Sequence, residues 1–383
     1  MDKTELIMLQ SLPLDIKIAK SKRRIQEWID YYGVDKVYIS FSGGKDSTVL
    51  LDLVRQVNPN IPAVFVDTGL EYPETKEFVK TIENVIIVRP KMSFKQVIEK
   101  YGYPMVSKEQ ANYLDDIRTS TPKMRLRRLE GDNQGRFKLS KKWHYLIDAP
   151  FKVSHRCCNV MKKQPAKKYE HDTGRVPFIG TLAEESILRQ QSYLKTGCNA
   201  FNSKRPNSTP LGFWREQDVL EYIYTNNLPI NKAYGEVLFK ENDLGNKTYY
   251  TTRCDRTGCV FCGFGAHLEK EPNRYQRLEL THPQLHSYCM DKLGFKEVCE
   301  YMNIPYDLKD LENGEWLDRD DYYYVISHNK DSLISQIKEI YNEDDDEVIE
   351  ELISQLNGEY IGAFVVYGSD DYPLCDCVIR KLI

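Results

Sequence analysis

The sequence of 383 residues contains no long apolar segment and no internal repeat. Its longest apolar runs, such as VYISF and AVFV, have the length of a β-strand, and none approaches the roughly 20 residues of a membrane helix. The N-terminal stretch MDKTELIMLQSLPLDIKIAK lacks the uninterrupted apolar core of a signal peptide. We therefore expect a cytoplasmic protein with no membrane partner. In that compartment, ten cysteines are more typical of thiols or metal ligands than of a disulfide framework.

Charge is distributed unevenly along the chain. From Tyr306 to the C-terminus there are 20 acidic and 6 basic residues, whereas residues 121–170 hold 14 Lys and Arg against 4 Asp and Glu. A basic surface suits an anionic substrate, and residues 121–168 are predicted to bind a nucleic-acid acceptor. The alternative is a solvated surface without a partner. For the acidic C-terminus, the alternatives are a surface that docks a protein partner and a regulatory lid.

Short apolar strands alternate with helices in the first two hundred residues. The strands are expected at residues 36–41, 61–67, 84–88 and 176–180. This alternation predicts an α/β fold, with a doubly wound parallel sheet and helices on both faces. Ligands of such sheets bind at the carboxyl ends of the strands, so we expect the turns at 42–47, 67–72 and 180–186 to lie at one edge.

Three regions are predicted along the chain. Residues 1–35 form an N-terminal helical segment, and residues 36–304 form a nucleotide-binding domain that includes a helical, cysteine-containing region. Residues 105–150 are rich in basic residues and interrupt the alternation of strands and helices. They are predicted to be an insertion over the site. Residues 305–383 form a small acidic appendage with two helices and a strand at 360–368.

The stretch VYISFSGGKDSTVLL is the most specific motif of the sequence. Its turn and the start of its helix consist of Ser42, Gly43, Gly44, Lys45, Asp46 and Ser47. Glycines let the backbone approach a ligand closely, and a helix N-terminus offers unpaired N–H groups and a positive dipole end to phosphate. Lys45 adds a positive charge, and Asp46 is predicted to help place Mg²⁺. The alternative is a plain strand-to-helix turn; the spacing is not that of the G-x-x-x-x-G-K-[ST] nucleotide loop.

The turn after the second strand also carries polar groups. It contains Asp67, Thr68 and Gly69 in the stretch VFVDTGLEYPET. Asp67 is placed to accept hydrogen bonds from a ribose or an adenine amino group. Its alternative role is to cap the turn or the helix that follows.

The stretches SFSGGKDSTVLLDL and VFVDTGLEYPET together resemble the phosphoadenosine phosphosulfate reductase family of the adenine nucleotide α-hydrolase, or ATP pyrophosphatase, superfamily. IGTLAEESILRQ and TPLGFWREQDVLEYIYTNNLPINKAYG fit as well, so the resemblance covers roughly residues 36–300. It implies a doubly wound domain that binds ATP or an adenylyl sulfate-type nucleotide, with the phosphates on residues 42–47. It also implies that Glu185, Ser186 and Arg189 face the anionic end of that nucleotide.

Four cysteines form a pattern that suits a metal site. They are Cys157 and Cys158, which are adjacent, and Cys259 and Cys262, which form a C-x-x-C pair. One zinc ion rarely accepts two consecutive cysteines, whereas each thiolate can reach a different iron of a [4Fe–4S] cluster. Zinc and unligated thiols remain alternatives, and Cys254 is a spare ligand. The cluster-bearing adenylyl sulfate reductases of the family use the same arrangement, which implies a [4Fe–4S] cluster.

The resemblance fails at two places. The reductases carry a C-terminal Cys-Gly-Leu-His motif whose cysteine attacks the sulfur of the sulfonucleotide, but this sequence ends in YPLCDCVIRKLI. Cys375 or Cys377 is an alternative nucleophile, unless both are ordinary cysteines of a terminal strand. The family also often has an arginine where Leu182 stands. Both departures argue against sulfonucleotide reduction.

Three functions are compatible with these sequence features. Superfamily members with this loop cleave ATP between its α and β phosphates, and cluster-bearing members insert sulfur into tRNA bases. By that resemblance, the first hypothesis is an iron–sulfur enzyme of sulfur transfer, in which Lys45, Asp46 and Arg189 act on ATP-Mg²⁺ and a separate donor supplies sulfur. The second is a reductase of adenylyl sulfate, or of its 3′-phosphorylated form, that uses a thioredoxin-like reductant. The third is a nucleotide-sensing or nucleic-acid-binding subunit without turnover.

Overall fold

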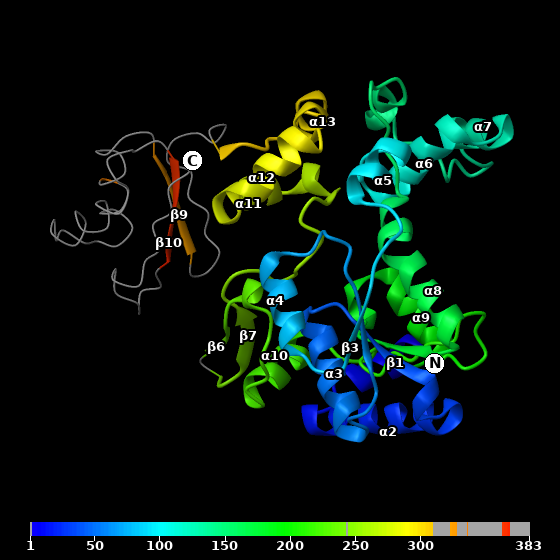
Figure 1. Cartoon of the computed structure of the whole chain (residues 1–383), viewed down its shortest axis with the longest axis vertical. Helices are drawn as coiled ribbons and strands as arrows, with labels where there is room; N and C mark the ends of the chain where they lie inside the picture. Colours follow the sequence, from blue (N-terminus) through cyan, green and yellow to red (C-terminus); the bar gives the residue numbers. More distant parts are fainter. Residues whose placement is uncertain (1, 243, 309–321, 328–334, 336–361, 368–383) are drawn as a thin grey trace. The chain divides into compact units, whose positions relative to one another are not determined.

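A computed structural model describes residues 2–242, 244–308, 322–327, 335 and 362–367 (Figure 1). The chain divides into two compact units, each made of two segments. Unit 1 contains Met1–Lys100 and Arg156–Val260, and unit 2 contains Tyr101–His155 and Phe261–Ile383. The three regions expected from the sequence stay a prediction. Among the described residues, no helix combines the length and the apolar character that a membrane crossing requires.

Unit 1 contains the predicted sheet. Its strands are β1 (Val37–Phe41), β2 (Ala63–Val66), β3 (Val85–Val88), β5 (Val176–Ile179), β6 (Val237–Glu241) and β7 (Lys247–Thr251). Its helices are α1 (Lys3–Gln10), α2 (Leu14–Tyr32), α3 (Lys45–Val57), α4 (Pro73–Thr81), α5 (Phe94–Tyr101), α8 (Gln164–Thr173), α9 (Ile187–Thr196) and α10 (Glu216–Thr225). α5 ends at the boundary with unit 2. The predicted strands at 36–41, 61–67, 84–88 and 176–180 correspond to the first four of these strands.

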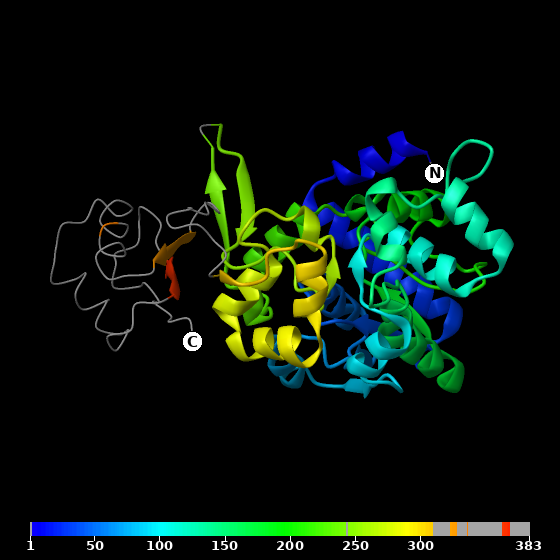
Figure 2. The same ribbon diagram turned by 90° about the horizontal axis from the view of Figure 1, so that it is seen from above.

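Four parallel strands form the sheet in the order β3-β2-β1-β5. In register, Ile39 pairs with Ala63 on β2 and with Phe178 on β5, so β1 is a central strand. β6 and β7 instead pair antiparallel as a separate ribbon, which Figure 2 shows extended. The α/β fold with a parallel sheet is therefore confirmed.

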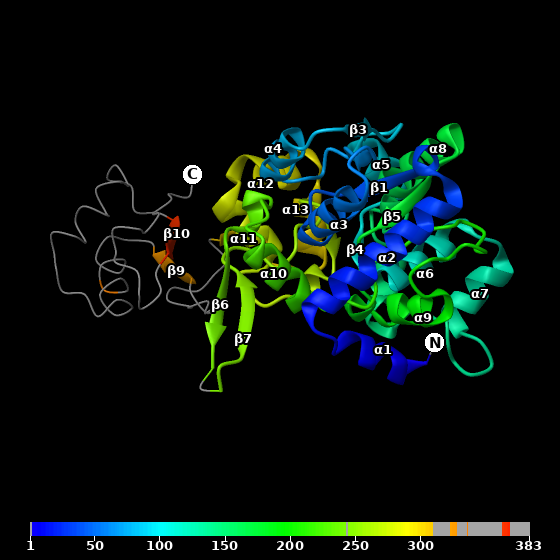
Figure 3. The same ribbon diagram turned by 90° about the horizontal axis from the view of Figure 1, so that it is seen from below.

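The two faces of the sheet carry different cores, because successive side chains of a strand point to opposite faces. Ile39 and Phe41 of β1 belong to a large core with residues of α2, α3 and α10. Tyr38 and Val64 point to the other face and contact Tyr169 of α8. Figure 3 shows α2 beside α3 on the first of these faces. Helices thus cover both faces, as a doubly wound sheet requires.

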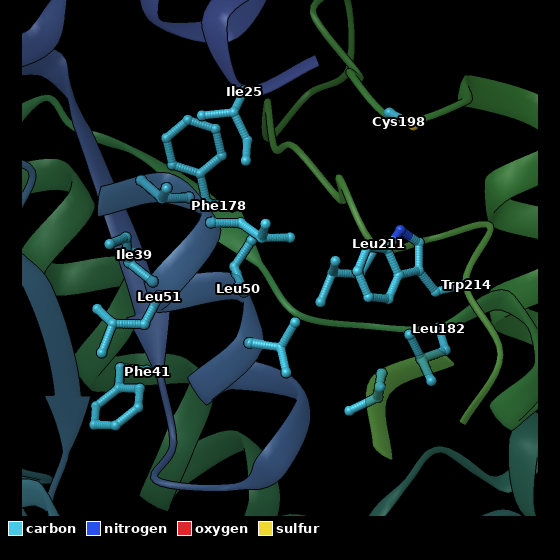
Figure 4. Close-up of a cluster of buried hydrophobic side chains, with 14 of the residues drawn as sticks. Ile25, Ile39, Phe41, Leu50, Leu51, Phe178, Leu182, Cys198, Leu211 and Trp214 are labelled. Carbon is cyan, nitrogen blue, oxygen red and sulfur yellow. The ribbon is translucent and has the colours of Figure 1, made fainter. Parts of the chain in front are cut away.

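The large core joins segments that are far apart in the chain. Ile25 of α2, Leu50 of α3 and Phe178 of β5 come together in it (Figure 4), and none of the three is exposed. Each fully buried side chain of this size contributes roughly 1.5–3 kcal/mol to stability. Trp214, also fully buried, donates from Nε1 to Ser21 Oγ at 2.9 Å, which ties the segment before α10 to α2.

Unit 2 is largely helical. It contains β4 (Met105–Val106), α6 (Lys108–Thr119), α7 (Pro122–Glu130), β8 (Gly263–Phe264), α11 (Arg274–Thr281), α12 (Pro283–Ser287), α13 (Phe295–Tyr301), β9 (Tyr322–Ser327) and β10 (Gly362–Tyr367). α6 and α7 occupy the predicted basic insertion. β4 pairs with β8, and β9 pairs antiparallel with β10, which matches the strand expected at 360–368. The two helices expected at 331–341 and 346–356, and the acidic run between them, lie outside the described residues, apart from the single position 335.

Candidate active site

The connectivity of the sheet places its topological switch point between β1 and β5. From β1 the chain moves to β2 and β3 on one side, and it later returns to β5 on the other side. Ligands of open α/β sheets bind where the strand order reverses in this way, outside the carboxyl ends of the strands. The turns at 42–47 and 180–186 follow those ends. They are in contact, since a Cβ on Gly180 would lie only 3.0 Å from the carbonyl oxygen of Asp46.

The first glycine of the loop is required by its conformation and its surroundings. Gly43 has a φ of +71°, in the left-handed region that favours glycine. A Cβ there would lie 2.8 Å from Thr75 Cγ2 and 3.2 Å from Val79 Cγ2, both on α4. The turn is therefore held against α4, and its backbone takes a shape that other residues adopt only with strain.

The hydroxyl groups of the loop hold the turn from inside. Ser47 Oγ donates to the carbonyl of Gly44 at 2.8 Å and accepts from the N–H of Ser42 at 3.2 Å. Ser42 Oγ accepts from the N–H of Gly44 at 3.3 Å. The two serines thus shape the loop that leads into the start of α3, which is the positive end of the helix dipole.

Lys45 is almost completely buried at this helix start, with 3% of its side chain exposed. Its Nζ lies 2.8 Å from Glu216 Oε1 and 3.6 Å from Asp46 Oδ1. Burial works against the charged form of Lys45, yet the neighbouring carboxylates outweigh it and raise its pKa. The Lys45 backbone N–H donates to the hydroxyl of Tyr234 at 3.2 Å, and this hydroxyl lies 3.1 Å from Thr257 Oγ1. The Tyr234 hydroxyl oxygen thus serves as the acceptor for this N–H at the N-terminus of α3.

Asp46 is the least satisfied group of the loop. Its Oδ1 is buried and has no hydrogen-bond partner. Burial raises the pKa of Asp46, and the Glu216 carboxylate raises it further, while Lys45 and Arg256 act in the opposite direction. A buried carboxylate oxygen without a donor is an available ligand for a cation.

Two arginines complete the charged surroundings. Arg189 of α9 forms an ion pair with Glu185, and Arg256 Nη1 lies 3.8 Å from the same carboxylate. The pKa of Arg189 is lowered, first by burial and then by the nearby charge of Arg256, while Asp46 opposes the change. Ser186 acts as the N-cap of α9, since its Oγ accepts from the N–H of Arg189 at 3.3 Å. The structure therefore brings Glu185 and Arg189 into the same electrostatic environment as Asp46.

The turn after β2 is organised by its own neighbours. Asp67 accepts from Arg89 Nε at 3.0 Å and from the N–H of Gly69 at 3.3 Å, and Lys76 lies 3.6 Å away. Burial opposes ionisation of Asp67, but the Arg89 hydrogen bond and the Lys76 charge prevail and lower its pKa. Thr68 donates to Glu71 at 2.5 Å. A nucleotide contact by Asp67, Thr68 or Gly69 stays a prediction.

Unit 1 brings one cysteine of each predicted pair to the same ammonium group. Burial opposes the charge of Lys162, but a hydrogen bond and attraction to Cys259, with further attraction to Glu71 and Cys158, raise its pKa. A cation beside a thiol favours the thiolate, which is the form that binds metals. Cys157 is buried next to Cys158 on a helical turn, so their side chains diverge by roughly 100°.

The prediction of a multi-iron group rests on the adjacency of Cys157 and Cys158 along the chain. Diverging neighbours can bind different irons of one cluster, as each corner needs one thiolate. Within the described part of the chain, no three His, Cys, Asp or Glu side chains gather closely enough to hold one metal ion. Cys262 belongs to unit 2, where its carbonyl accepts from Arg274 Nη1 at 2.6 Å, and the spare Cys254 donates from Sγ to the Ala233 carbonyl at 3.0 Å. The [4Fe–4S] cluster itself stays a prediction.

Four residues of this site were missed by the sequence reasoning. They are Glu216, Tyr234, Arg256 and Thr257, all brought to the loop by the tertiary fold. Arg256 and Thr257 lie shortly before the C-x-x-C pair in CDRTGCVFC, separated from Cys259 by Gly258, and that position was the signal available for them. Glu216 and Tyr234 lie in the stretch TPLGFWREQDVLEYIYTNNLPINKAYG, whose resemblance to the family was the signal for them.

Residues 36–263 match the family model described as the phosphoadenosine phosphosulfate reductase domain. The chain belongs to this family. The match spans the whole sheet of unit 1 and the C-x-x-C pair, and it leaves α11 to β10 outside.

Individual members of the phosphoadenosine phosphosulfate reductase family are distant in sequence. The uncharacterised protein MJ0973 of Methanocaldococcus jannaschii is 25% identical over 280 residues, which cover 72% of this chain and 50% of that protein. The chain thus spans half the length of this relative. Adenosine 5'-phosphosulfate reductase of Lysinibacillus sphaericus is 26% identical over 206 residues, covering 54% of this chain and 70% of that protein. The solved phosphoadenylyl-sulfate reductase of Candida auris shares 16% identity with a TM-score of 0.35, over 67% of this chain and 98% of that one.

Asp46→Asn is expected to stabilise the fold near pH 8 while it abolishes Mg²⁺-dependent nucleotide binding. The folded-state pKa of Asp46 is raised, so its charge destabilises the fold above that pKa, and the penalty disappears as the pH falls below the unfolded-state value. An unsatisfied buried acceptor costs about 1 kcal/mol or more, so we expect the Tm to rise by about 2–4 °C. Thermal unfolding at pH 8 and pH 4 measures this, with the gain confined to pH 8.

The matched control is Asp67→Asn. The pKa of Asp67 is lowered, so its charge stabilises the fold above the unfolded-state pKa, and that contribution is lost as the pH falls through the folded-state value. The control is therefore expected to lower the Tm at pH 8. Equal changes in the Tm of Asp46→Asn and Asp67→Asn would contradict the opposite pKa shifts of the two carboxylates.

Proposed function

We propose that this chain binds ATP-Mg²⁺ at residues 42–47, cleaves it to AMP and pyrophosphate, and activates an acceptor for sulfur transfer. The observation that carries the proposal is the buried Asp46 Oδ1, which has no hydrogen-bond partner and lies with Glu216 beside Lys45 at the start of α3. Two carboxylates are unfavourable neighbours for a bare polyphosphate. They are suitable neighbours for Mg²⁺, which proteins bind through one or two carboxylates together with substrate phosphates.

The charged side chains have separate tasks in this proposal. Lys45 and the N–H groups at the start of α3 hold the phosphates, and Lys45 exchanges Glu216 for a phosphate oxygen. The phosphate ligand replaces the Tyr234 hydroxyl as the acceptor of the Lys45 backbone N–H. Arg189 and Arg256 stabilise the charge that develops on the pyrophosphate.

The first step joins acceptor and nucleotide. An acceptor oxygen attacks the α-phosphorus, the bond from that phosphorus to the bridging oxygen breaks, and the electron pair leaves with pyrophosphate. In the second step the sulfur of a donor attacks the acceptor carbon, and AMP leaves with the oxygen. No net oxidation or reduction occurs in these two steps.

The cysteines supply the second part of the site. Cys157, Cys158, Cys259 and Cys262 would hold a [4Fe–4S] cluster, and the ammonium group of Lys162 is attracted to Cys259 and Cys158. When bound, such a cluster would supply an electrostatic and electron-transfer centre beside the nucleotide, since all four irons would already carry a thiolate. The described residues provide its thiolates and the positive charge next to them.

A second candidate is sulfonucleotide reduction, which the names of relatives from Lysinibacillus sphaericus and Bacillus subtilis favour. In that reaction a thiolate attacks the sulfur of adenylyl sulfate, AMP leaves, and a dithiol reductant releases sulfite from the thiosulfonate as its own sulfurs form a disulfide. Cys375 and Cys377, the predicted nucleophiles, lie outside the described residues.

Pyrophosphate release from ATP by the anaerobically purified full chain tests the proposal. Release that requires Mg²⁺ and rises with bulk tRNA or DNA supports ATP cleavage and identifies the acceptor class. Sulfite release from adenylyl sulfate in the presence of thioredoxin, without pyrophosphate release from ATP, would replace the proposal by reduction. Nucleotide binding with neither product would leave a sensor.

The cluster has its own expected result. Anaerobically purified protein should contain about four iron atoms and four acid-labile sulfides per chain, and Cys158→Ser should lower both by half or more. The control is Cys198→Ala, because Cys198 is buried against the Tyr193 hydroxyl in the core of unit 1. Stoichiometric zinc with negligible iron would contradict the cluster.

A further inference from the structure

The helix α7 presents positive charge without contributing to the core. None of its residues is buried, although its sequence PKMRLRRLE includes Met124, Leu126 and Leu129. Leu126 is 53% exposed, and Lys123, Arg125 and Arg127 are exposed. Folding alone does not explain such a helix, because a surface helix ordinarily buries an apolar stripe.

The loop after α7 displays an aromatic ring in a strained conformation. Phe137 has a φ of +63° and is 41% exposed. A bulky non-glycine residue in the left-handed region costs about 1–3 kcal/mol, and such strain persists where the surroundings enforce it, commonly at functional positions. An exposed phenylalanine gains little in return from folding.

The surroundings of Phe137 are well defined. The guanidinium groups of Arg127 and Arg136 lie 4.8 and 5.5 Å from the centre of its ring. Asp132 accepts from Arg136 Nε at 3.1 Å and from Nη2 at 3.0 Å, which fixes the plane of that guanidinium. The loop is also attached to α7, because Leu139 donates from its N–H to the carbonyl of Arg128 at 2.7 Å.

Arg128 connects the same loop to α6. It donates to Asp116 at 2.8 Å and to the Phe137 carbonyl at 3.3 Å, and its guanidinium lies 4.3 Å from the ring centre of Tyr113. Because Arg128 is occupied in this way, it is a structural residue. The exposed cations that have no ion pair among the described residues are Lys123, Arg125, Arg127, Lys138, Lys141 and Lys142.

We propose that α7 and residues 131–142 bind single-stranded nucleic acid, with the unpaired cations on the phosphates and the Phe137–Arg136 pair as a stacking platform for a base. Residues 121–142 hold eight Lys and Arg against two acidic residues, which suits a polyanion. The exposed ring and oriented guanidinium favour unstacked bases, since aromatic and arginine planes are what such bases stack on. This binding goes beyond the proposed ATP chemistry and does not depend on it.

The test is fluorescence anisotropy of a labelled 20-nucleotide RNA with the full chain, over a series of salt concentrations. Arg125→Gln/Lys138→Gln should weaken binding and reduce the slope of log K against log salt by about 1.4, because each phosphate contact on a single strand contributes about 0.7. Phe137→Gly relieves the strained φ and removes the ring. It should weaken binding by roughly 5- to 100-fold with the slope unchanged, the effect of one lost stacking contact.

The control is Lys80→Gln/Lys95→Gln, which removes the same charge from exposed positions of unit 1. It should leave both affinity and slope as in the wild type. Equal effects of the two double variants, or no binding at 50 mM salt, would overturn the proposal. Tighter binding of duplex than of single strands would do so too, as would competition by poly-glutamate as effective as by poly(U), which would assign the surface to an acidic polypeptide. None of these outcomes depends on ATP cleavage, so the two proposals fail separately.

Discussion

Lys45→Met is expected to reduce pyrophosphate release from ATP by at least about 10²-fold, the loss that follows removal of one preorganised charge at a developing anion. The methionine keeps most of the apolar stem and removes the charge. Lys45 is the cation placed directly at the start of α3, beside the loop glycines at which the proposed function places the phosphates. Its present partners, Glu216 at 2.8 Å and Asp46 at 3.6 Å, cannot replace it, since both are carboxylates.

Lys17→Met is the matched control for this variant. Lys17 is equally buried, with 2% of its side chain exposed, and its Nζ lies 2.6 Å from Asp218 Oδ2, on the same helix as Glu216. Breaking a buried ion pair costs about 3–5 kcal/mol, so both variants should lose stability. Below the Tm of each, only Lys45→Met should lose ATP binding and turnover. Comparable loss of turnover in both would show that Lys45 is important for folding alone.

Trp214→Ala is expected to lower the free energy of unfolding of unit 1 by about 3–5 kcal/mol, the usual cost of removing a large buried aromatic side chain. Trp214 is fully buried in the core with Leu182 and Leu211 (Figure 4), and its ring lies 5.9 Å from that of Tyr222. Urea unfolding followed by far-UV circular dichroism measures the loss. The removed indole also leaves the Ser21 hydroxyl with one partner fewer.

Trp214→Phe separates packing from hydrogen bonding. It keeps an aromatic ring but loses the bond from Nε1 to Ser21 Oγ, so a smaller destabilisation is expected, near the 1 kcal/mol typical of one hydrogen bond plus part of the packing loss. Leu182 packs in the same core, next to residues 183–186. Trp214→Phe should therefore also weaken nucleotide binding slightly. Wild-type stability in Trp214→Ala would contradict the core described here.

Local patterns were sufficient for the sheet and its glycine loop. The apolar runs at residues 36–41 and 61–67 are too short for helices and are followed by turn residues, which is typical of buried parallel strands. Local patterns could not predict the strand order, because every strand of a parallel sheet shows the same apolar pattern on both faces. That order decides where the topological switch point lies, between β1 and β5.

The sequence by itself determined the family, the parallel α/β sheet, the position of the glycine loop and the two cysteine pairs, because each depends on residues that are close along the chain. Only the tertiary structure brought Glu216, Tyr234 and Arg256 to Lys45 and Asp46, about 170 to 210 residues away in the chain. It also placed Lys162 beside Cys158 and Cys259. Burial and charge at these positions arise from packing between distant segments, and packing has no local signature in the sequence.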